Sequence, residues 1–258
     1  MDYQAIAYEV TDGLAVIRLN RPEVRNALNT RMRVELTHAV RRAEREARAL
    51  VLTGAGDAFC AGQDLADKGN AANLDVERTL RDEYEPMIRA IHGAAIPVMA
   101  AVNGAAAGAG ANLALAADVV IAAERAVFIQ AFARIGLIPD AGGTYWLPRK
   151  IGFARAMGSM LFAEPVPARQ AESWGMIWQA VPDAEFETVW RTRARALASG
   201  PTEAFRRMRE ALRASYENGL DQQLELEAHL QGECGRTRDF TEGVMAFLEK
   251  RPAAFEGR

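Results

Sequence analysis

The stretch IPVMAAVNGAAAGAGANLALAADVVIAA, residues 96–123, sets the pattern for the whole chain. It opens with one short apolar run (96–102) and closes with another (118–123), and both are typical of buried strands. Between them, a glycine-rich turn leads into an alanine- and leucine-rich segment that predicts a buried helix. The stretch therefore predicts a strand, a tight turn, a helix and a second strand.

The same region has no formally charged residue from Ala90 to Ala117, a length that a membrane-spanning helix would need. Proline, glycine and asparagine interrupt it, and such residues favour strand, turn and buried helix over one continuous span. We therefore expect no membrane crossing here. The interrupting residues are Pro97, Asn103, Gly104, Gly108, Gly110 and Asn112.

Upstream, LAVIRL (14–19) and ALVLTG (49–54) are predicted strands that flank a predicted helix over residues 30–48. Strand, helix and strand in succession indicate a parallel sheet. The helix repeats apolar residues at helical spacing, and its arginine-rich opposite face is interpreted as solvated. The apolar positions are Met32, Leu36, Val40, Ala43 and Ala47.

After about Pro182 the chain changes to long, charged, amphipathic stretches that predict helices, with breaks at Gly200-Pro201 and at Gly219. We expect a core over 1–195 and a helical region over 196–258. The predicted helical stretches are 184–200, 201–219, 221–232 and 239–251.

Composition excludes several classes of protein. The 258 residues are 50% hydrophobic and 25% charged, with a formal net charge of -3, which suits one large globular domain or a domain with a smaller appendage and gives no basic surface for nucleic acid. The two cysteines, Cys60 and Cys234, suggest neither a disulfide framework nor a zinc site, so no metal is expected. The start MDYQAIAYEV lacks the pattern of a secretory signal, and a cytoplasmic location is expected.

Two glycine-rich turns, TGAGDAFCAGQDL (53–65) and NGAAAGAGANLALAAD (103–118), each follow a predicted strand and can present backbone amides to a ligand. Glycines also serve tight turns or close packing, and that interpretation stays open. Leu113 stands where a dinucleotide fingerprint needs its third glycine, so phosphate binding is not expected. Two convergent amides suit a thioester carbonyl that gains negative charge, as in an oxyanion hole.

Asp140 is a lone carboxylate in the apolar, glycine-rich segment GLIPDAGGTYW. One interpretation is a helix N-cap, worth about 1 kcal/mol. The other is a partly desolvated acid/base with a raised pKa. The three histidines, His38, His92 and His229, are interpreted as surface or structural residues, and Cys60 as a small buried one.

Four motifs in order carry a family resemblance: NRPEVRNAL (20–28), GAGDAFCAGQDL (54–65), the turn over 103–118 and GLIPDAGGTYWLPR (136–149). With the ending EGVMAFLEKRPAAF, they resemble the enoyl-CoA hydratase/isomerase (crotonase) superfamily nearly end to end. The resemblance implies an α/β fold, namely a spiral of ββα units followed by a C-terminal helical trimerisation region. It also implies a homo-oligomer, either a trimer or a dimer of trimers.

The resemblance further implies catalytic residues. The backbone amides of Gln63 and Ala109 are expected to hold a thioester oxygen, and Asp140 occupies the position of the catalytic aspartate of isomerases. The two glutamates of hydratases are replaced by Asn112 and Phe132, neither of which can act as a general base. Water addition by the hydratase mechanism is therefore expected to be absent or very slow.

The implied ligand is an acyl-CoA, with coenzyme A as part of the substrate and no redox or metal cofactor. Backbone groups around Ala61 and Asp64 are expected at the adenine end of CoA, and Arg25 near its phosphates. Phe247 and Lys250 are expected to contribute from a neighbouring subunit. Each of these side chains has an alternative interpretation. Arg25 can be a solvated surface arginine, Lys250 a charge that complements a helix C-terminus, and Phe247 an ordinary core residue.

Within the family, FCAGQDL (59–65), 131–149 and SWGMIWQAV (173–181) are most similar to isomerases of phenylacetate degradation. The expected reaction is conversion of 1,2-epoxyphenylacetyl-CoA to oxepin-CoA. The alternatives are a Δ3,Δ2-enoyl-CoA isomerase of fatty-acid oxidation and a catalytically silent acyl-CoA-binding protein. Four residues are candidates for the wall of an aromatic acyl pocket: Phe132, Ile138, Tyr145 and Trp146. For most of them, packing in the core is the expected role.

Overall fold

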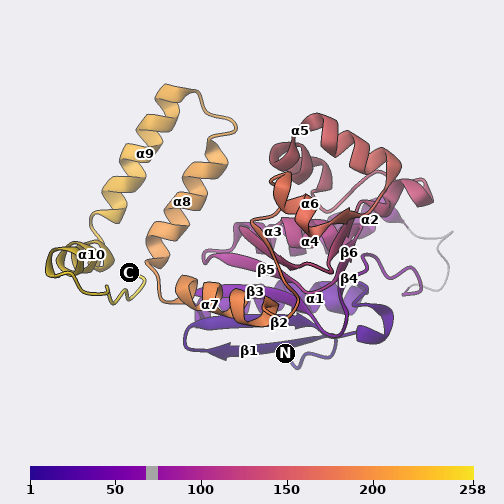
Figure 1. Ribbon diagram of the computed structural model, residues 1–258, viewed down its shortest axis with the longest axis horizontal. Helices are drawn as coiled ribbons and strands as arrows, with labels where there is room; N and C mark the ends of the chain where they lie inside the picture. The colour runs from indigo at the N-terminus through magenta and orange to yellow at the C-terminus, as the bar shows by residue number, and fades with distance from the viewer. Residues whose placement is uncertain (68–74) are drawn as a thin grey trace.

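The fold is built on two β-sheets, as the computed structural model shows for the residues it describes, 1–67 and 75–258 (Figure 1). The larger, six-stranded sheet has the order β1-β2-β3-β5-β7-β10. The first strand pairs antiparallel with β2, and the other neighbours are parallel. Its strands are β1 (Ile6–Thr11), β2 (Leu14–Leu19), β3 (Ala49–Gly54), β5 (Val98–Val102), β7 (Val119–Ala123) and β10 (Gln179–Val181).

A smaller, four-stranded sheet has the order β4-β6-β8-β9. Three strands of the large sheet, β3, β5 and β7, are each followed along the chain by a strand of the small sheet, so the chain advances through both sheets in step. This confirms the α/β class and the spiral of ββα units. The small strands are β4 (Ala58–Cys60), β6 (Ala105–Ala107), β8 (Val127–Ile129) and β9 (Val166–Pro167).

Helices cover both faces of the large sheet, and alternate residues of each strand face opposite sides. In β2, Ala15 and Ile17 pack in the main core with α1 and α3, whereas Leu14 and Val16 pack under α7 around the fully buried Trp190. The helices of this part are α1 (Thr30–Glu46), α2 (Val76–Thr79), α3 (Glu85–Gly93), α4 (Ala109–Leu115), α5 (Gly143–Phe162), α6 (Ala168–Ser173) and α7 (Phe186–Ala198), with the helical turns η1 (Pro22–Val24), η3 (Leu80–Tyr84) and η4 (Ala131–Ile135).

The predicted strands and the first predicted helix are confirmed. The helix α1 starts after Asn29, whose side chain accepts the N–H of Met32 at 2.8 Å. The prediction that the charged face of this helix is solvated is wrong for Arg33 and Glu35. Both side chains are buried, and hydrogen-bonding partners offset the cost of burying their charges. Glu35 accepts the N–H groups of three N-terminal residues, Gln4, Ala5 and Ile6.

The uncharged span over 90–117 is divided among α3, β5, β6 and α4, as predicted. Among the described residues, no helix is both long enough and apolar enough to cross a membrane.

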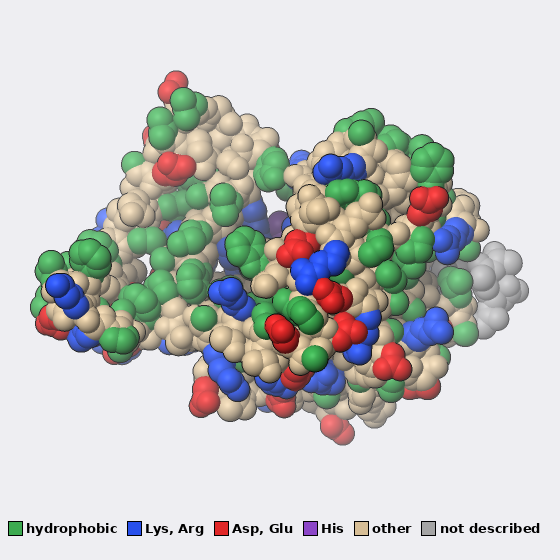
Figure 2. All heavy atoms as spheres, viewed as in Figure 1, with side chains coloured by type: hydrophobic (Ala, Val, Ile, Leu, Met, Phe, Trp, Pro, Cys, Tyr) green, Lys and Arg blue, Asp and Glu red, His purple; other side chains and the backbone are tan. Residues whose placement is uncertain are grey.

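The C-terminal helices α8 (Thr202–Ala214), α9 (Leu220–Cys234) and α10 (Arg238–Glu249) project away from the two sheets (Figure 1). The predicted boundary at residue 195 falls within α7, which stays on the large sheet until Ala198. Arg209 of α8 ties this lobe to the core, because it binds Asp118 at 2.7 Å and the carbonyl of Ile96 at 3.0 Å. Figure 2 shows hydrophobic side chains gathered on the lobe formed by α8, α9 and α10.

Candidate active site

The fold brings the two glycine-rich turns into direct contact. Strands β4 and β6 pair in parallel, which places the turn after Cys60 beside the turn after Ala107. A Cβ on Gly62 would lie 2.7 Å from the carbonyl oxygen of Ala107, and one on Gly110 would lie 2.3 Å from that of Cys60. No side chain fits in either position, so both glycines allow a close approach of two backbones.

Two backbone N–H groups where the two turns meet are candidates for binding a ligand. The N–H groups of Ala61 and Asp64 donate to the carbonyls of Arg25 and Leu28, at 2.9 and 3.2 Å. Across the ranges that the structure describes, the N–H groups of Gln63 and Ala109 have no such acceptor. Ala109 is the first residue of α4, so its amide is one of the unsatisfied donors of a helix N-terminus. The arrangement suits a developing negative charge.

The side chain of Gln63 has a separate role. Its Oε1 accepts hydrogen bonds from the hydroxyl of Tyr84 at 2.5 Å and from the buried Arg33 at 3.0 Å. Its Nε2 donates to the carbonyl of Asp64 at 3.1 Å. The side chain is thereby held by the protein, and the role of the Gln63 backbone amide as the donor stays a prediction.

Asp140 lies in the loop between η4 and α5, and its environment disfavours a charge. Its Oδ1 is buried and has no hydrogen-bond partner among the described residues. Desolvation raises the pKa of the Asp140 carboxyl from 3.8 to about 6, against a smaller opposing effect of a backbone hydrogen bond. A carboxyl of this kind can both accept and return a proton near neutral pH.

The helix-cap interpretation of Asp140 is wrong. The helix α5 is capped by Gly142, in the left-handed region, and no side chain caps it. At the start of α5 it is the backbone carbonyl of Asp140, and not its carboxyl, that accepts the N–H of Gly143, at 2.8 Å. The carboxyl group therefore does not cap α5.

A cavity of about 630 Å³ opens beside Asp140 between α3 and the start of α5. Of the four predicted wall residues, Ile138, Tyr145 and Trp146 line it, whereas Phe132 does not and lies 3.8 Å from the position of a Cβ on Gly108. Ile138, Tyr145 and Trp146 therefore do more than pack the core, because each also lines the cavity. The other apolar residues of the wall include Val76, Leu80, Ile88, Leu137 and Pro139.

Comparison with known proteins shows to which family this chain belongs. A family model described as enoyl-CoA hydratase/isomerase matches residues 9–258. The chain belongs to the enoyl-CoA hydratase/isomerase family. It is 62% identical to a "Probable enoyl-CoA hydratase" of Rhodobacter capsulatus, and the match covers the whole length of both chains. It is also 44% identical to the "1,2-epoxyphenylacetyl-CoA isomerase" of Escherichia coli, over 98% of both chains.

Solved structures of the enoyl-CoA hydratase/isomerase family share the fold throughout. A putative enoyl-CoA hydratase/isomerase from Mycobacterium abscessus superimposes with a TM-score of 0.93 at 40% identity, covering 98% of this chain and all of the other. These relatives include both a probable hydratase and an isomerase, so membership of the family does not by itself identify the reaction.

The two positions at which the family resemblance implies the glutamates of hydratases hold no acid or base here. Asn112 is fully buried on α4, and its amide binds the carbonyl of Asp140 at 2.8 Å. Phe132 is buried in η4. Two carboxyl residues among those described, Glu85 and Asp140, line the cavity, and Asp140 is the one whose loop is bonded to α4, the helix that begins at Ala109.

Two further residues line the cavity wall, and sequence reasoning gave neither of them a role at the site. His92, expected from the sequence to be a surface or structural residue, lines the cavity, and its ring lies tilted against Trp146 with centroids 4.8 Å apart. Burial lowers the pKa of His92 to about 4, so its ring is neutral at physiological pH. Tyr84 lines the cavity and binds Gln63. No sequence signal marks Tyr84, because its place depends on a π-helical turn.

The other predictions for single side chains agree with the structure. His38 accepts or donates a hydrogen bond with Tyr3 at 2.8 Å, and His229 is exposed beside Glu233. Cys60 is fully buried, and burial raises the pKa of its thiol to about 12, so the sulfur stays protonated.

The predicted CoA-contact residues fall into two groups. Arg25 is exposed, and its backbone carbonyl accepts the N–H of Ala61. Asp64 follows Gln63 directly and binds Arg21 at 2.7 Å. Arg25, Ala61 and Asp64 therefore lie close to the two candidate amides. Phe247 and Lys250 lie on and just after α10, far from that site in the same chain (Figure 1). Phe247 is 83% exposed, so core packing does not account for it.

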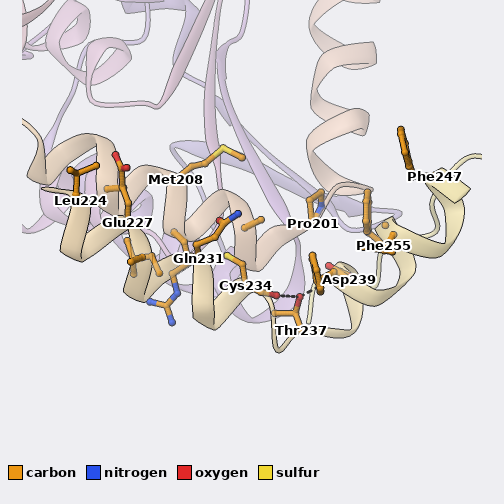
Figure 3. A pocket seen from close by; sticks show the side chains of 18 of the residues that line it. Pro201, Met208, Leu224, Glu227, Gln231, Cys234, Thr237, Asp239, Phe247 and Phe255 are labelled. Atoms are coloured by element: carbon orange, nitrogen blue, oxygen red, sulfur yellow. Dashed lines mark hydrogen bonds between the residues drawn. The ribbon is translucent and has the colours of Figure 1, made fainter.

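A second cavity, of about 960 Å³, lies among α8, α9 and α10. Figure 3 shows side chains of α9 with Met208 of α8 and Phe255 of the C-terminal tail around it. Its lining is mostly apolar, and its charged residues among those described are Arg207, Glu227 and Asp239. Exposed apolar side chains on these helices include Leu212, Leu224, Phe240, Phe247 and Leu248.

Proposed function

We propose that this chain is an acyl-CoA isomerase that converts 1,2-epoxyphenylacetyl-CoA to oxepin-CoA. The observation that carries the proposal is Asp140, a partly buried carboxyl with a raised pKa on the wall of an apolar cavity, in a chain whose hydratase positions hold Asn112 and Phe132. The 44% identity to an isomerase of that name supports the choice of substrate.

The backbone amides of Gln63 and Ala109 would bind the thioester oxygen. When a proton leaves the carbon next to the thioester, negative charge develops on that oxygen, and two fixed donors stabilise it. Each donor of this kind is worth on the order of 100- to 1000-fold in rate. Coenzyme A is then part of the substrate, with Arg25, Ala61 and Asp64 near one end of it.

Asp140 would move the proton. With a 3-enoyl-CoA, its carboxylate removes a proton from C2 and returns it to C4, so the double bond shifts to C2 and the atoms balance without metal or redox chemistry. This reaction defines the second candidate, a Δ3,Δ2-enoyl-CoA isomerase, whose acyl chain would suit the aliphatic part of the cavity wall, which includes Leu80, Ile88 and Leu137.

The test compares wild type with Asp140→Asn on enzymatically generated 1,2-epoxyphenylacetyl-CoA and on a 3-enoyl-CoA, with products identified by mass spectrometry and ultraviolet absorbance. Wild type should convert the epoxide faster than the alkene, with turnover that rises with pH around a midpoint near 6. The variant should lose at least 100-fold in turnover and still bind the CoA ester.

Three other outcomes separate the alternatives. Faster turnover of the alkene would select the fatty-acid isomerase. Binding without turnover of either substrate would select a silent acyl-CoA-binding protein. Rapid hydration of a 2-enoyl-CoA that survives Asp140→Asn would contradict an isomerase built on Asp140.

We also propose that the chain forms a homo-oligomer, a trimer or a dimer of trimers, through the lobe of α8, α9 and α10. The support is the set of exposed apolar side chains on these helices, because a monomer rarely leaves so many together in water. A neighbouring copy would then bring Phe247 and Lys250 towards a CoA site.

A further inference from the structure

Asn112 links two segments of the active site through its side-chain amide. Its Nδ2 donates to the backbone carbonyl of Asp140 at 2.8 Å. Its Oδ1 accepts from Nε2 of Gln130 at 2.9 Å. Gln130 is 4% exposed and lies just before η4. A buried chain of hydrogen bonds therefore runs from Gln130 through Asn112 to the loop that carries Asp140.

The direction of these bonds is set by the chemistry of the two amides. An amide has a donor end and an acceptor end. Because Gln130 donates to Oδ1 of Asn112, Nδ2 of Asn112 is turned towards Asp140. The other end of Gln130, Oε1, is buried without a partner in the described part of the chain, which is unfavourable for stability. The bond to Asn112 is the side-chain hydrogen bond that Gln130 makes to the described residues.

The loop that Asn112 holds adopts an unfavourable backbone conformation. Ala141 has a φ of 48° and Gly142 a φ of 85°, both in the left-handed region, which an alanine rarely enters. The loop also packs directly on the Asn112 amide, since a Cβ on Gly143 would lie 2.4 Å from Nδ2. A strained segment persists only where its surroundings hold it.

We propose that Asn112, oriented by Gln130, is a positioning residue that fixes the Asp140 loop and keeps its carboxyl at the acyl cavity. This inference rests on the proposed function, in which Asp140 moves the proton. An amide at this position also adds no second negative charge near Asp140, whereas a glutamate or aspartate would.

The main test is Asn112→Asp, which keeps the shape and the acceptor but removes the donor to Asp140. We expect kcat to fall at least tenfold while KM changes less than twofold. The pH midpoint of kcat should move upwards from about 6, because a nearby carboxylate disfavours ionisation of Asp140. The other titratable side chains that line the cavity, unchanged in the variant, are Tyr84, Glu85, Arg89, His92 and Tyr145.

A second variant, Gln130→Leu, removes the donor that orients Asn112 and keeps the inference testable if Asn112→Asp does not fold. It should lower kcat threefold or more, again with little change in KM. The matched control is Gln179→Leu in β10, where Gln179 Oε1 is also buried without a partner among the described residues. This control should leave kcat and its pH midpoint unchanged.

The outcomes separate this inference from the proposed function. If Asp140→Asn retains wild-type turnover, the proposed function fails. If Asp140→Asn is inactive but Asn112→Asp and Gln130→Leu keep wild-type kcat and pH midpoint per folded enzyme, the positioning role is overturned. In the Asp140→Asn background, Asn112→Asp should cause no further loss of the residual rate.

Discussion

Asp140 is a residue whose placement works against the stability of the fold. Its Oδ1 is buried without a hydrogen-bond partner in the described structure, and burial holds its pKa at about 6. Native proteins satisfy most of their buried polar atoms, so an exception on a cavity wall points to chemistry. Its backbone carbonyl, in contrast, is bound twice, by Asn112 and by Gly143.

Replacing Asp140 by Asn should therefore stabilise the protein above pH 6. The folded-state pKa of about 6 exceeds the ordinary value of 3.8, so the folded state favours the protonated carboxyl. As pH rises from about 4 to 6, the unfolded chain loses its proton first, and the destabilisation grows to its full size above pH 6. For a group that keeps some exposure, we expect about 1 to 3 kcal/mol.

The measurement is the free energy of unfolding of wild type and Asp140→Asn, by urea denaturation at pH 8 and at pH 4. The variant should be the more stable at pH 8, and the difference should shrink at pH 4. A variant that is less stable than wild type at pH 8 would show that the carboxylate has a structural role after all.

Among the elements, the π-helical turn η3 has a particular effect on the site. It interrupts the helical segment between α2 and α3 and carries Tyr84 at its end. Tyr84 and Arg33 then clamp the side chain of Gln63, and Arg33 is itself fixed by Glu83 at 2.5 Å. The turn that presents the Gln63 amide is held in this way from the helical side, as β4 and β6 hold it from the sheet.

Tyr84→Phe should lower turnover roughly fivefold with little change in KM. The substitution removes one of the two hydrogen bonds that Oε1 of Gln63 accepts, each worth about 1 kcal/mol, and so loosens the turn that bears the amide donor. Steady-state kinetics on the preferred acyl-CoA measures the effect.

Tyr145→Phe is the matched control for this prediction. Tyr145 lines the same cavity, and among the described residues its hydroxyl makes no hydrogen bond. It should keep wild-type turnover. Equal losses in the two variants would indicate that both hydroxyls act on the substrate and not through Gln63.

At the scale of the whole molecule, the chain divides into a packed core and a lobe that leaves apolar side chains in water. The lobe is fastened to the core by polar contacts, including Arg209 with Asp118 at 2.7 Å and Arg48 with the carbonyl of Phe255 at 2.9 Å. Its exposed apolar residues make the lobe the most direct candidate for contact between copies.

The double variant Phe247→Glu, Leu248→Glu should shift the protein towards monomers. Both side chains are exposed, at 83% and 69%, and charges there would oppose an apolar contact between subunits. Size-exclusion chromatography with light scattering should show a trimer or hexamer for wild type and a smaller species for the variant.

The control for the lobe is Val34→Glu on α1, an exposed apolar residue of the core at 49% exposure, which should keep the wild-type mass. A wild type that is monomeric at micromolar concentration would contradict the proposed oligomer. Should the double variant also lose affinity for CoA, a neighbouring subunit's role in the CoA site would gain support.

The sequence by itself determined much of this protein. Apolar runs bounded by turn residues predicted the strands β2, β3, β5 and β7, and helical spacing predicted α1 and the C-terminal helices, because these signals are local to the chain. The four ordered motifs indicated the family. The lone carboxylate at Asp140 was identifiable from its apolar, glycine-rich surroundings.

Only the tertiary structure decided the rest. The short strands of the small sheet have three residues or fewer, too few for a periodic signal, yet their pairing brings the two amide-bearing turns together. Whether Asp140 caps a helix depends on where α5 begins, and its pKa depends on burial by residues distant in sequence. Arg33, Tyr84 and His92 likewise received their places from contacts across the fold, which no local pattern encodes.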